Sequence, residues 1–260
     1  MDLRIAGRVA FVAASSQGLG LACARSLARE GVRVTLNGRD EVTLAAAASA
    51  LRAELPDAEV AWIAADLTTR EGRERIVAQL PEVDILVTNN AGPAPGALAD
   101  WDEDALIGAL RANAIPAVEL MRAWLPGMRA RRFGRVVNIT SAMVTSPAAD
   151  MGLSASARTA LTAISKSIGR EAVADDVTIN NLLPERIDTP RQAFMAERRM
   201  QREGIDREEA YRRIADTIAA KRLGRPGEFG DACAFLCSAQ AGYISGQNLH
   251  LDGGTYEGLI

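Results

Sequence analysis

Seven short runs of apolar residues, separated by stretches with helical patterning, constrain the fold of this chain more than any other feature. Within each run the apolar residues are nearly continuous, which indicates strands that are buried on both faces. Strands of this kind that alternate with helices form a parallel sheet, and right-handed crossovers make that sheet doubly wound. The predicted strands span 8–13, 32–36, 59–65, 84–89, 134–140, 177–183 and 247–252.

Capping and breaking residues delimit the helices between these strands. Asp40 and Thr68 are predicted N-caps, and Gly31 is predicted to end the first helix. Pro116 is predicted to kink a long helix, because proline cannot donate the backbone hydrogen bond of a helix interior. The predicted helical segments span 18–30, 40–54, 68–80, 102–131, 154–174 and 226–238.

The segment 190–222 is long, helical in pattern and dense in charges of both signs. Gly204 and Asp206 predict two helices with a turn between them. We interpret the segment as a helical substrate lid with a solvated outer face. The alternative is a contact element for a partner or for a second subunit. No linker or internal repeat divides the chain, so residues 1–260 are predicted to form one α/β domain.

The composition excludes several classes of function. A net charge of −3 gives no basic field for nucleic acid. No apolar run approaches the roughly 20 residues that span a bilayer, so no membrane partner is predicted. One histidine, and three cysteines without a Cys-x-x-Cys motif, predict no metal site. The apolar stretch from Val9 to Ala14 is interpreted as a strand rather than a signal peptide, and the cysteines as small buried hydrophobes, which predicts a cytoplasmic protein.

The turns after the first two strands carry the strongest chemical signal, since ligands of such sheets bind at the carboxyl ends of the strands. Gly18 and Gly20 permit close backbone approach at a helix N-terminus, which attracts a pyrophosphate. The alternative is a tight turn that only packs helix against strand. The second turn, Asn37-Gly38-Arg39, has a cation where an acid would bind the ribose of NAD. Arg39 therefore favours the 2′-phosphate of NADP(H), unless it is simply a solvated turn residue.

Later turns fit the same ligand. Asp66 and Leu67 follow the third strand, where they can meet the edge of an adenine. The tetrapeptide Asn89-Asn90-Ala91-Gly92 follows the fourth strand, and Ser141 places a hydroxyl after the fifth. The run from Pro184 to Thr189 ends the sixth strand.

With these motifs the chain resembles the short-chain dehydrogenase/reductase family over essentially its whole length, and in particular a divergent 3-oxoacyl-ACP-reductase-like branch. The resemblance rests on the turn at Gly18 and Gly20, on Asn89-Asn90-Ala91-Gly92, and on three later runs. These runs are Gly224-Arg225-Pro226, Tyr243-Ile244-Ser245-Gly246-Gln247 and Leu251-Asp252-Gly253-Gly254. The resemblance implies a Rossmann-like fold, and it implies a homotetramer or homodimer built on the helices at 102–131 and 154–174.

The resemblance also implies roles for individual residues. Ser141 would hydrogen-bond the substrate carbonyl, and Asn113 would anchor a proton-relay water. The implied cofactor contacts are Ser15, Ser16, Gly18, Leu19 and Gly20 at the phosphates and ribose, Asp66 and Leu67 at the adenine, Asn90, Ala91 and Gly92 at the ribose, and Ile187 and Thr189 at the nicotinamide amide. Asn37, Arg39 and Pro184 complete the predicted cofactor set.

The chain departs from the family at the positions that supply its general acid and the neighbouring cation. Ser154 and Arg158 occupy the positions of the family's general-acid tyrosine and its lysine. A serine hydroxyl is a far weaker acid than a phenol, and an arginine stays charged at any working pH. Ala14 and Glu185 also stand where the family has glycines.

These observations predict an oxidoreductase that transfers a hydride between NADP(H), or less favourably NAD(H), and a small carbonyl or alcohol substrate. Ser141, Asn113, Ser154 and Arg158 are its predicted catalytic group. The proton would come from a water held by Asn113 and the two serines, from Glu185 or from Asp188. The alternative is a non-catalytic NAD(P)-binding sensor or scaffold, and a reaction without net redox on the same fold is a third possibility.

Overall fold

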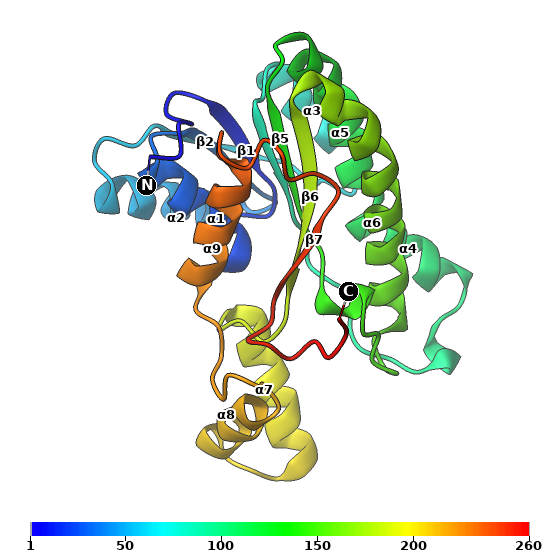
Figure 1. Ribbon diagram of the computed structural model, residues 1–260. Coiled ribbons are helices and arrows are strands. Elements are labelled where there is room, and N and C mark those ends of the chain that lie inside the picture. Colours follow the sequence, from blue (N-terminus) through cyan, green and yellow to red (C-terminus); the bar gives the residue numbers. More distant parts are fainter. Residues whose placement is uncertain (1, 260) are drawn as a thin grey trace.

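A computed structural model describes residues 2–259, and a parallel sheet of seven strands forms its centre (Figure 1). The strand order is β3-β2-β1-β4-β5-β6-β7, and every neighbouring pair is parallel. The order reverses between β1 and β4, which is where such sheets bind ligands. All seven predicted strands are confirmed: β1 Val9–Val12, β2 Arg33–Gly38, β3 Val60–Ala64, β4 Ile85–Thr88, β5 Gly134–Ile139, β6 Val177–Pro184 and β7 Asn248–Leu251.

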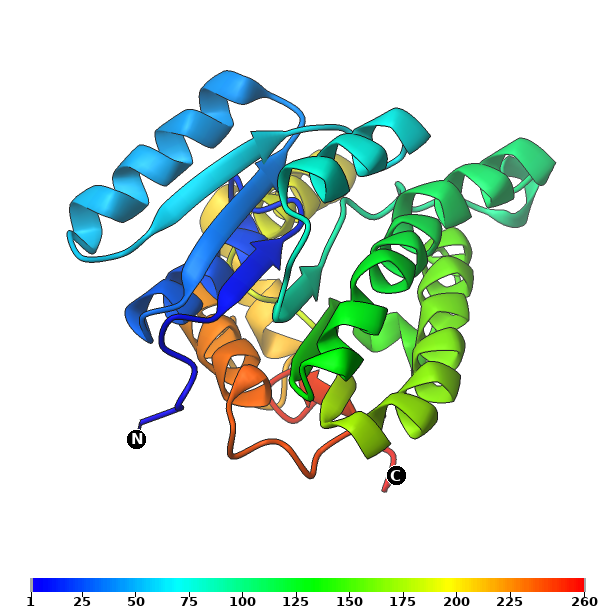
Figure 2. The same cartoon turned by 90° about the horizontal axis from the view of Figure 1, so that it is seen from above.

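Helices cover both faces of this sheet (Figures 1 and 2). Helices α1, α2 and α9 bury one face, and helices α3, α5 and α6 bury the other. The helices are α1 Gly18–Arg29, α2 Glu41–Glu54, α3 Arg70–Gln79, α4 Glu103–Asn113, α5 Ile115–Ala130, α6 Gly152–Ala172, α7 Pro190–Glu203, α8 Arg207–Asp216 and α9 Pro226–Cys237, with 3-10 turns η1 Leu98–Asp100, η2 Ala142–Val144 and η3 Val173–Asp175. The cysteines Cys23, Cys233 and Cys237 are fully buried and unpaired in the first layer, as small hydrophobes.

The predicted helix ends are confirmed in most places and wrong in one. Asp40 caps α2 by accepting a hydrogen bond from the Thr43 backbone N–H at 2.8 Å. Thr68 is not the cap of α3: Thr69 Oγ1 accepts from the Gly72 N–H at 3.0 Å. Thr68 instead donates from its hydroxyl and its N–H to Asp66 Oδ1, because the carboxylate lies two residues before it.

The long helix predicted over 102–131 is two helices, α4 and α5, with a break at Ala114. Pro116 causes the break, because its ring nitrogen has no hydrogen to donate to the carbonyl of Ala112. The side-chain amide of Asn90 donates to that carbonyl instead, at 2.6 Å. A loop residue after β4 is thereby tied to the end of α4.

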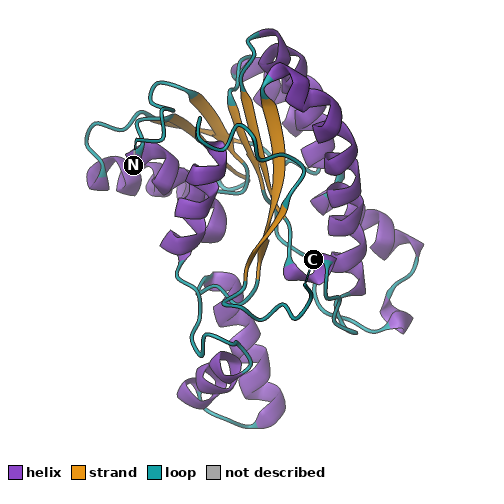
Figure 3. Cartoon of the chain, in the orientation of Figure 1, coloured by secondary structure: helices purple, strands orange, loops and turns teal. Residues whose placement is uncertain are grey.

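The segment 190–222 contains the two predicted helices, α7 and α8, which form a separate pair beyond one end of the sheet (Figure 3). Gly204 ends α7 with a positive φ of 64°, and Asp206 caps α8 by accepting from the Glu209 N–H at 2.9 Å. Within residues 2–259, no helix has the length and apolarity that a membrane span requires.

Candidate active site

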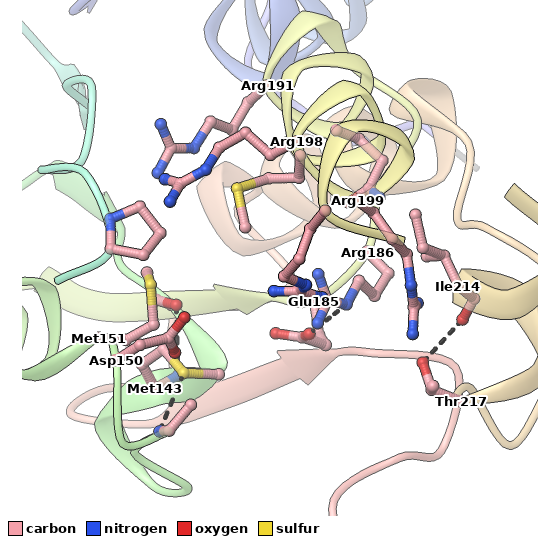
Figure 4. A pocket seen from close by; sticks show the side chains of 16 residues that line it. Met143, Asp150, Met151, Glu185, Arg186, Arg191, Arg198, Arg199, Ile214 and Thr217 are labelled. Carbon is pink, nitrogen blue, oxygen red and sulfur yellow. Dashed lines mark hydrogen bonds and ion pairs between the residues drawn. The ribbon is translucent and has the colours of Figure 1, made fainter. Parts of the chain in front are cut away.

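The loops that follow β5 and β6 meet the lid helices around a cavity of about 390 Å³ (Figure 4). One wall comes from the segment after β5, with Ser141, Met143 and Met151. The opposite wall comes from α7, and Glu185 lies between them at the end of β6. The cavity therefore opens at the carboxyl edge of the sheet, where parallel strands bring distant loops together.

Ser141 stands at the start of the η2 turn and faces this cavity. Its Oγ accepts a hydrogen bond from the Met143 N–H at 3.2 Å. Within residues 2–259, the Ser141 hydroxyl donates no hydrogen bond. Its proton is therefore available to a carbonyl oxygen in the cavity.

Arg158 and Ser154 lie one turn apart on α6 and are both buried, at 8% and 3% exposure. The Arg158 Nη1 donates to the carbonyls of Ile139 and Thr140 at 3.0 and 2.7 Å, and its Nε donates to Ser154 Oγ at 3.3 Å. The Nη2 reaches the Asn90 carbonyl at 3.5 Å. Arg158 thus joins the end of β5, directly before Ser141, to the loop after β4.

No carboxylate within residues 2–259 forms an ion pair with Arg158. Burial, assisted by the positive charge of Arg191, lowers the pKa of Arg158 to about 10. The guanidinium therefore remains charged at neutral pH. Gly92 lies directly beside this charge, since a Cβ on Gly92 would stand 3.3 Å from Arg158 Nη2 and 3.7 Å from Ser154 Oγ.

Asn113 is the last residue of α4, directly before the helix break at Ala114. Its side chain lies near Asn90 and Arg158. Its Nδ2 donates to the Ala109 carbonyl at 3.3 Å, whereas its Oδ1 is buried and has no hydrogen-bond partner among the described residues. A cavity of about 10 Å³, lined by Asn113, Asn90 and Arg158 among others, lies there. That volume holds about one water molecule.

Glu185 follows the last residue of β6, and its side chain is 18% exposed. Burial raises the pKa of this carboxyl, although its ion pair with Arg186 at 2.9 Å opposes the rise. The side chain lines the cavity of Ser141 and also a second cavity of about 270 Å³. Asp188 is exposed and lines neither of them.

The turn after β1 fits the phosphates of a dinucleotide. Gln17 makes no side-chain cap on α1, so the first backbone N–H groups of that helix are open to an anion. A Cβ on Gly20 would lie 2.5 Å from the Ala14 carbonyl oxygen, so only glycine fits this close approach. A Cβ on Gly18 would lie 4.0 Å from that of Thr189, which places the turn opposite the loop after β6.

The turn after β2 fits the 2′-phosphate. Arg39 is exposed and has no ion pair within residues 2–259, and Ser16 Oγ lies against the neighbouring Gly38. Burial alone would raise the pKa of Asp66, but hydrogen bonds from Thr68 and the charge of Arg39 bring it below its usual value. Arg39 and Asp66 therefore lie at the same corner of the site.

Several predicted cofactor residues hold the loops of the site in place by hydrogen bonds to the backbone. Asn37 is buried and donates to the carbonyls of Ile63 and Ala65, and Ser15 Oγ donates to the Val12 carbonyl at 2.7 Å. Thr189 caps α7 by accepting from the Gln192 N–H at 3.4 Å. Four other members lie in the turns where they were predicted, half-buried or buried: Leu19 at the start of α1, Leu67 after β3, Pro184 at the end of β6 and Ile187 after it. Ala91, after β4, is exposed, and its N–H donates to Asn90 Oδ1 at 2.9 Å.

Comparison with known proteins identifies the family. Residues 13–256 match a family model described as enoyl-(acyl carrier protein) reductase. The 3-oxoacyl-[acyl-carrier-protein] reductase FabG of Vibrio cholerae is 30% identical, and the match covers 98% of this chain and 99% of FabG. The chain belongs to the short-chain dehydrogenase/reductase family. The predicted family and fold class are confirmed.

Two further members of the family carry NADPH in their descriptions. The NADPH-dependent reductase BacG of Bacillus subtilis is 28% identical, over 97% of this chain and 99% of BacG. The L-sorbose reductase of Gluconobacter frateurii, solved with NADPH and L-sorbose, superposes with a TM-score of 0.93 at 30% identity and covers 100% of both chains.

None of the three tyrosines of this short-chain dehydrogenase/reductase lines the cavity of Ser141. Tyr211 packs under Arg207, with 5.4 Å from the Cζ to the ring centre. Tyr256 stacks on His250, and Tyr243 is fully exposed. No tyrosine therefore lines the cavity of Ser141, and the assignment of Ser154 and Arg158 to the tyrosine and lysine positions of the family stays a prediction of the resemblance.

Sequence reasoning missed the part of the site that comes from the lid. Arg191 and Arg198 line the cavity from α7, as does Met195 between them. Their spacing of two helical turns places both arginines on one face of the helix, and this spacing was the available signal. The same pattern is also typical of a solvated helix surface, which is how the segment was interpreted.

Proposed function

We propose that this chain is an NADP(H)-dependent oxidoreductase that interconverts a carbonyl compound and its alcohol. The observation that carries the proposal is that Ser141 lines the cavity of about 390 Å³ while the buried pair of Ser154 and Arg158 contacts the backbone directly before it. Arg158 binds the backbone directly before Ser141 and the hydroxyl of Ser154. The relatives described as NADPH-dependent support the choice of cofactor.

The cofactor would be held by the turn after β1 at its phosphates and by Arg39 and Ser16 at the 2′-phosphate. When bound, it supplies or accepts the hydride. The Ser141 hydroxyl donates a hydrogen bond to the substrate carbonyl, which orients the carbonyl and stabilises the negative charge that develops on its oxygen. Arg158 adds a fixed positive charge beside this position, at the place of the family's lysine.

Reduction also requires a proton for the substrate oxygen, and we propose Glu185 as its source. Glu185 lines the same cavity as Ser141, and burial raises its pKa toward the range of a working general acid. Asp188 is outside the cavity, which disfavours it. The water-sized cavity at Asn113 and Arg158 offers a place for a relay water that returns a proton to the site.

The first test is cofactor binding. NADPH and NADH are titrated into the wild-type protein and Arg39→Ala, with binding followed by calorimetry. We expect the variant to bind NADPH about tenfold more weakly, because a charged hydrogen bond is lost, and to bind NADH as before. An equal loss for both nucleotides would contradict the assignment of Arg39 to the 2′-phosphate.

The second test separates an enzyme from a non-catalytic binding protein. The absence of a tyrosine at the cavity favours this alternative, which predicts NADPH binding without turnover. The wild-type protein and Ser141→Ala are assayed for NADPH oxidation with a panel of aldehydes and ketones. We expect Ser141→Ala to retain NADPH affinity and to lose about 10²–10³-fold in kcat, as when one oxyanion donor is removed. NADPH binding with no turnover of any carbonyl by the wild type would establish the sensor or scaffold.

A further inference from the structure

The cavity beside Ser141 is strongly basic (Figure 4). Its charged lining consists of Arg186, Arg191, Arg198, Arg199, Arg202, Asp150 and Glu185. Most of the arginines come from one face of α7, which forms the wall opposite Met151 and Asp150. The charges of this site are therefore not balanced by the residues that line it.

Two of the arginines have no carboxylate partner. Arg186 pairs with Glu185 at 2.9 Å. Arg199 and Arg202 pair with Glu203, at 2.9 and 3.0 Å. Within residues 2–259, no ion pair is formed by Arg191 or Arg198.

These two side chains are held together although their charges repel. Their Cζ atoms lie 5.5 and 6.0 Å from the centre of the Phe194 ring, which is placed between them in sequence. Burial, and then the charge of Arg198, lower the pKa of Arg191. In Figure 4 both guanidinium groups extend from α7 toward the wall with Asp150 and Met151.

The backbone adds to this positive potential. Arg191 is the second residue of α7, and the first turn of this helix contains no acidic residue. A cation at a helix N-terminus is opposed by the helix dipole, whereas an anion there is stabilised. Two clustered cations, one of them in the first turn of α7, thus line the same cavity, and a bound anion would relieve their repulsion.

We propose that the substrate carries an anionic group, a carboxylate or a phosphate, which Arg191 and Arg198 bind while Ser141 binds the carbonyl. This inference rests on the proposed function, because it names the substrate class of the same site. The cavity of about 390 Å³ limits the substrate to a small molecule. Met143, Met151 and Met195 are among the apolar residues that line it and would accommodate an apolar middle section of the substrate.

The test compares each anionic probe with a neutral partner. Levulinate is paired with methyl levulinate, and dihydroxyacetone phosphate with dihydroxyacetone, so the two pairs separate carboxylate from phosphate recognition. Each compound is titrated calorimetrically into the complex of the protein with NADPH. We expect at least one anion to bind about 100-fold more tightly than its neutral partner, with affinity that falls as salt is added.

Variants then assign the discrimination to the two arginines. We expect Arg191→Gln and Arg198→Gln each to reduce the preference for the anion about tenfold, and the double variant to abolish it. Arg207→Gln is the matched control, because Arg207 also lies on the lid, contacts an aromatic ring and has no ion pair among the described residues, but does not line the cavity. The control should keep the preference.

Two outcomes would overturn the inference. One is equal affinity, or no binding, for the anionic and neutral members of both pairs. The other is a loss of NADPH affinity in Arg191→Gln or Arg198→Gln, which would show that these arginines bind the phosphates of the cofactor. Failure of the proposed function has a different signature: NADPH binds without turnover of any carbonyl compound, whether or not anions are preferred.

Discussion

Arg158 is a charged side chain buried without a counter-ion, an arrangement that is costly unless every donor finds an acceptor. The carbonyls of Ile139, Thr140 and Asn90 and the hydroxyl of Ser154 supply an acceptor for each of its three nitrogens. The planar fork of a guanidinium can donate in several fixed directions at once, whereas an ammonium is a compact point charge. Ser154 and Arg158 therefore depend on each other, because the Ser154 hydroxyl accepts a hydrogen bond from the buried guanidinium of Arg158.

The pKa of Glu185 leads to a prediction about pH. Since burial raises this pKa above the usual 4.5, the folded state holds the proton more tightly than the unfolded state. The free energy of unfolding should then fall as pH rises from about 4.5 through the raised pKa. Glu185→Gln cannot ionise, so it should be more stable than the wild type at neutral pH and similar to it in acid. Chemical denaturation at several pH values measures this.

The activity of Glu185→Gln is predicted to change as well. Reduction by the wild type should decline as pH rises through the raised pKa, because the proton donor is lost. The variant should be about 10²–10⁴-fold slower and should lack this decline. Glu59→Gln, which removes an exposed carboxylate before β3, is the control. An unchanged pH profile in Glu185→Gln would exclude Glu185 as the proton source.

Ala14 has a left-handed backbone, with a φ of 44°, at a position where the family resemblance implies glycine. A Cβ in this conformation costs about 1 kcal/mol or more. Ala14→Gly should therefore raise the free energy of unfolding by about 1 kcal/mol. The same substitution at Ala28, inside α1, should lower it by about 1 kcal/mol. If urea titrations showed that Ala14→Gly lowers the free energy of unfolding, the backbone of Ala14 would not be strained.

At the scale of elements, the two lid helices α7 and α8 are held together by ion pairs rather than by a large hydrophobic core. Glu203, near the end of α7, pairs with Arg199 and Arg202 of its own helix and with Arg213 of α8. The turn between the helices depends on Gly204, whose φ is 64°. These contacts keep the arginine face of α7 directed at the cavity.

Gly204→Ala should weaken this turn. A Cβ at Gly204 meets no atom within 4 Å, so the expected loss of about 1 kcal/mol comes from the positive φ alone. Gly108→Ala on α4 also meets no atom within 4 Å, but its backbone is helical, so it should stabilise by up to about 1 kcal/mol. Thermal unfolding compares the two. Equal effects of both variants would contradict the role of backbone conformation.

At the scale of the whole molecule, the helices α4, α5 and α6 form an outer layer with partly exposed apolar residues. Leu106, Ile115 and Ile164, one on each helix, are 42%, 41% and 39% exposed. These are the helices that the family resemblance implied as subunit contacts. The homotetramer or homodimer stays a prediction, and this layer is its expected interface.

Ile164→Asp should therefore shift the protein to a smaller assembly, because a carboxylate in an apolar interface loses its hydration. Val42→Asp on α2 is the control, since Val42 is 77% exposed in the opposite helix layer. Sedimentation velocity measures both. A wild-type monomer, or an assembly that Ile164→Asp leaves intact, would refute this interface.

The sequence alone determined the seven strands and the turn at Gly18 and Gly20, because these features depend on local patterning and backbone geometry, which neighbouring residues decide. The role of Ser141 and the replacement of tyrosine and lysine come from the family resemblance and stay predictions. Only the tertiary structure decided that Asn113 and Arg158 share one small cavity, through the break before Pro116. It also brought Glu185, Arg191 and Arg198 around Ser141. Residues far apart in sequence meet because helices pack on a sheet and a lid lies over its edge, and the periodicity of a helix does not reveal which neighbour its face will contact.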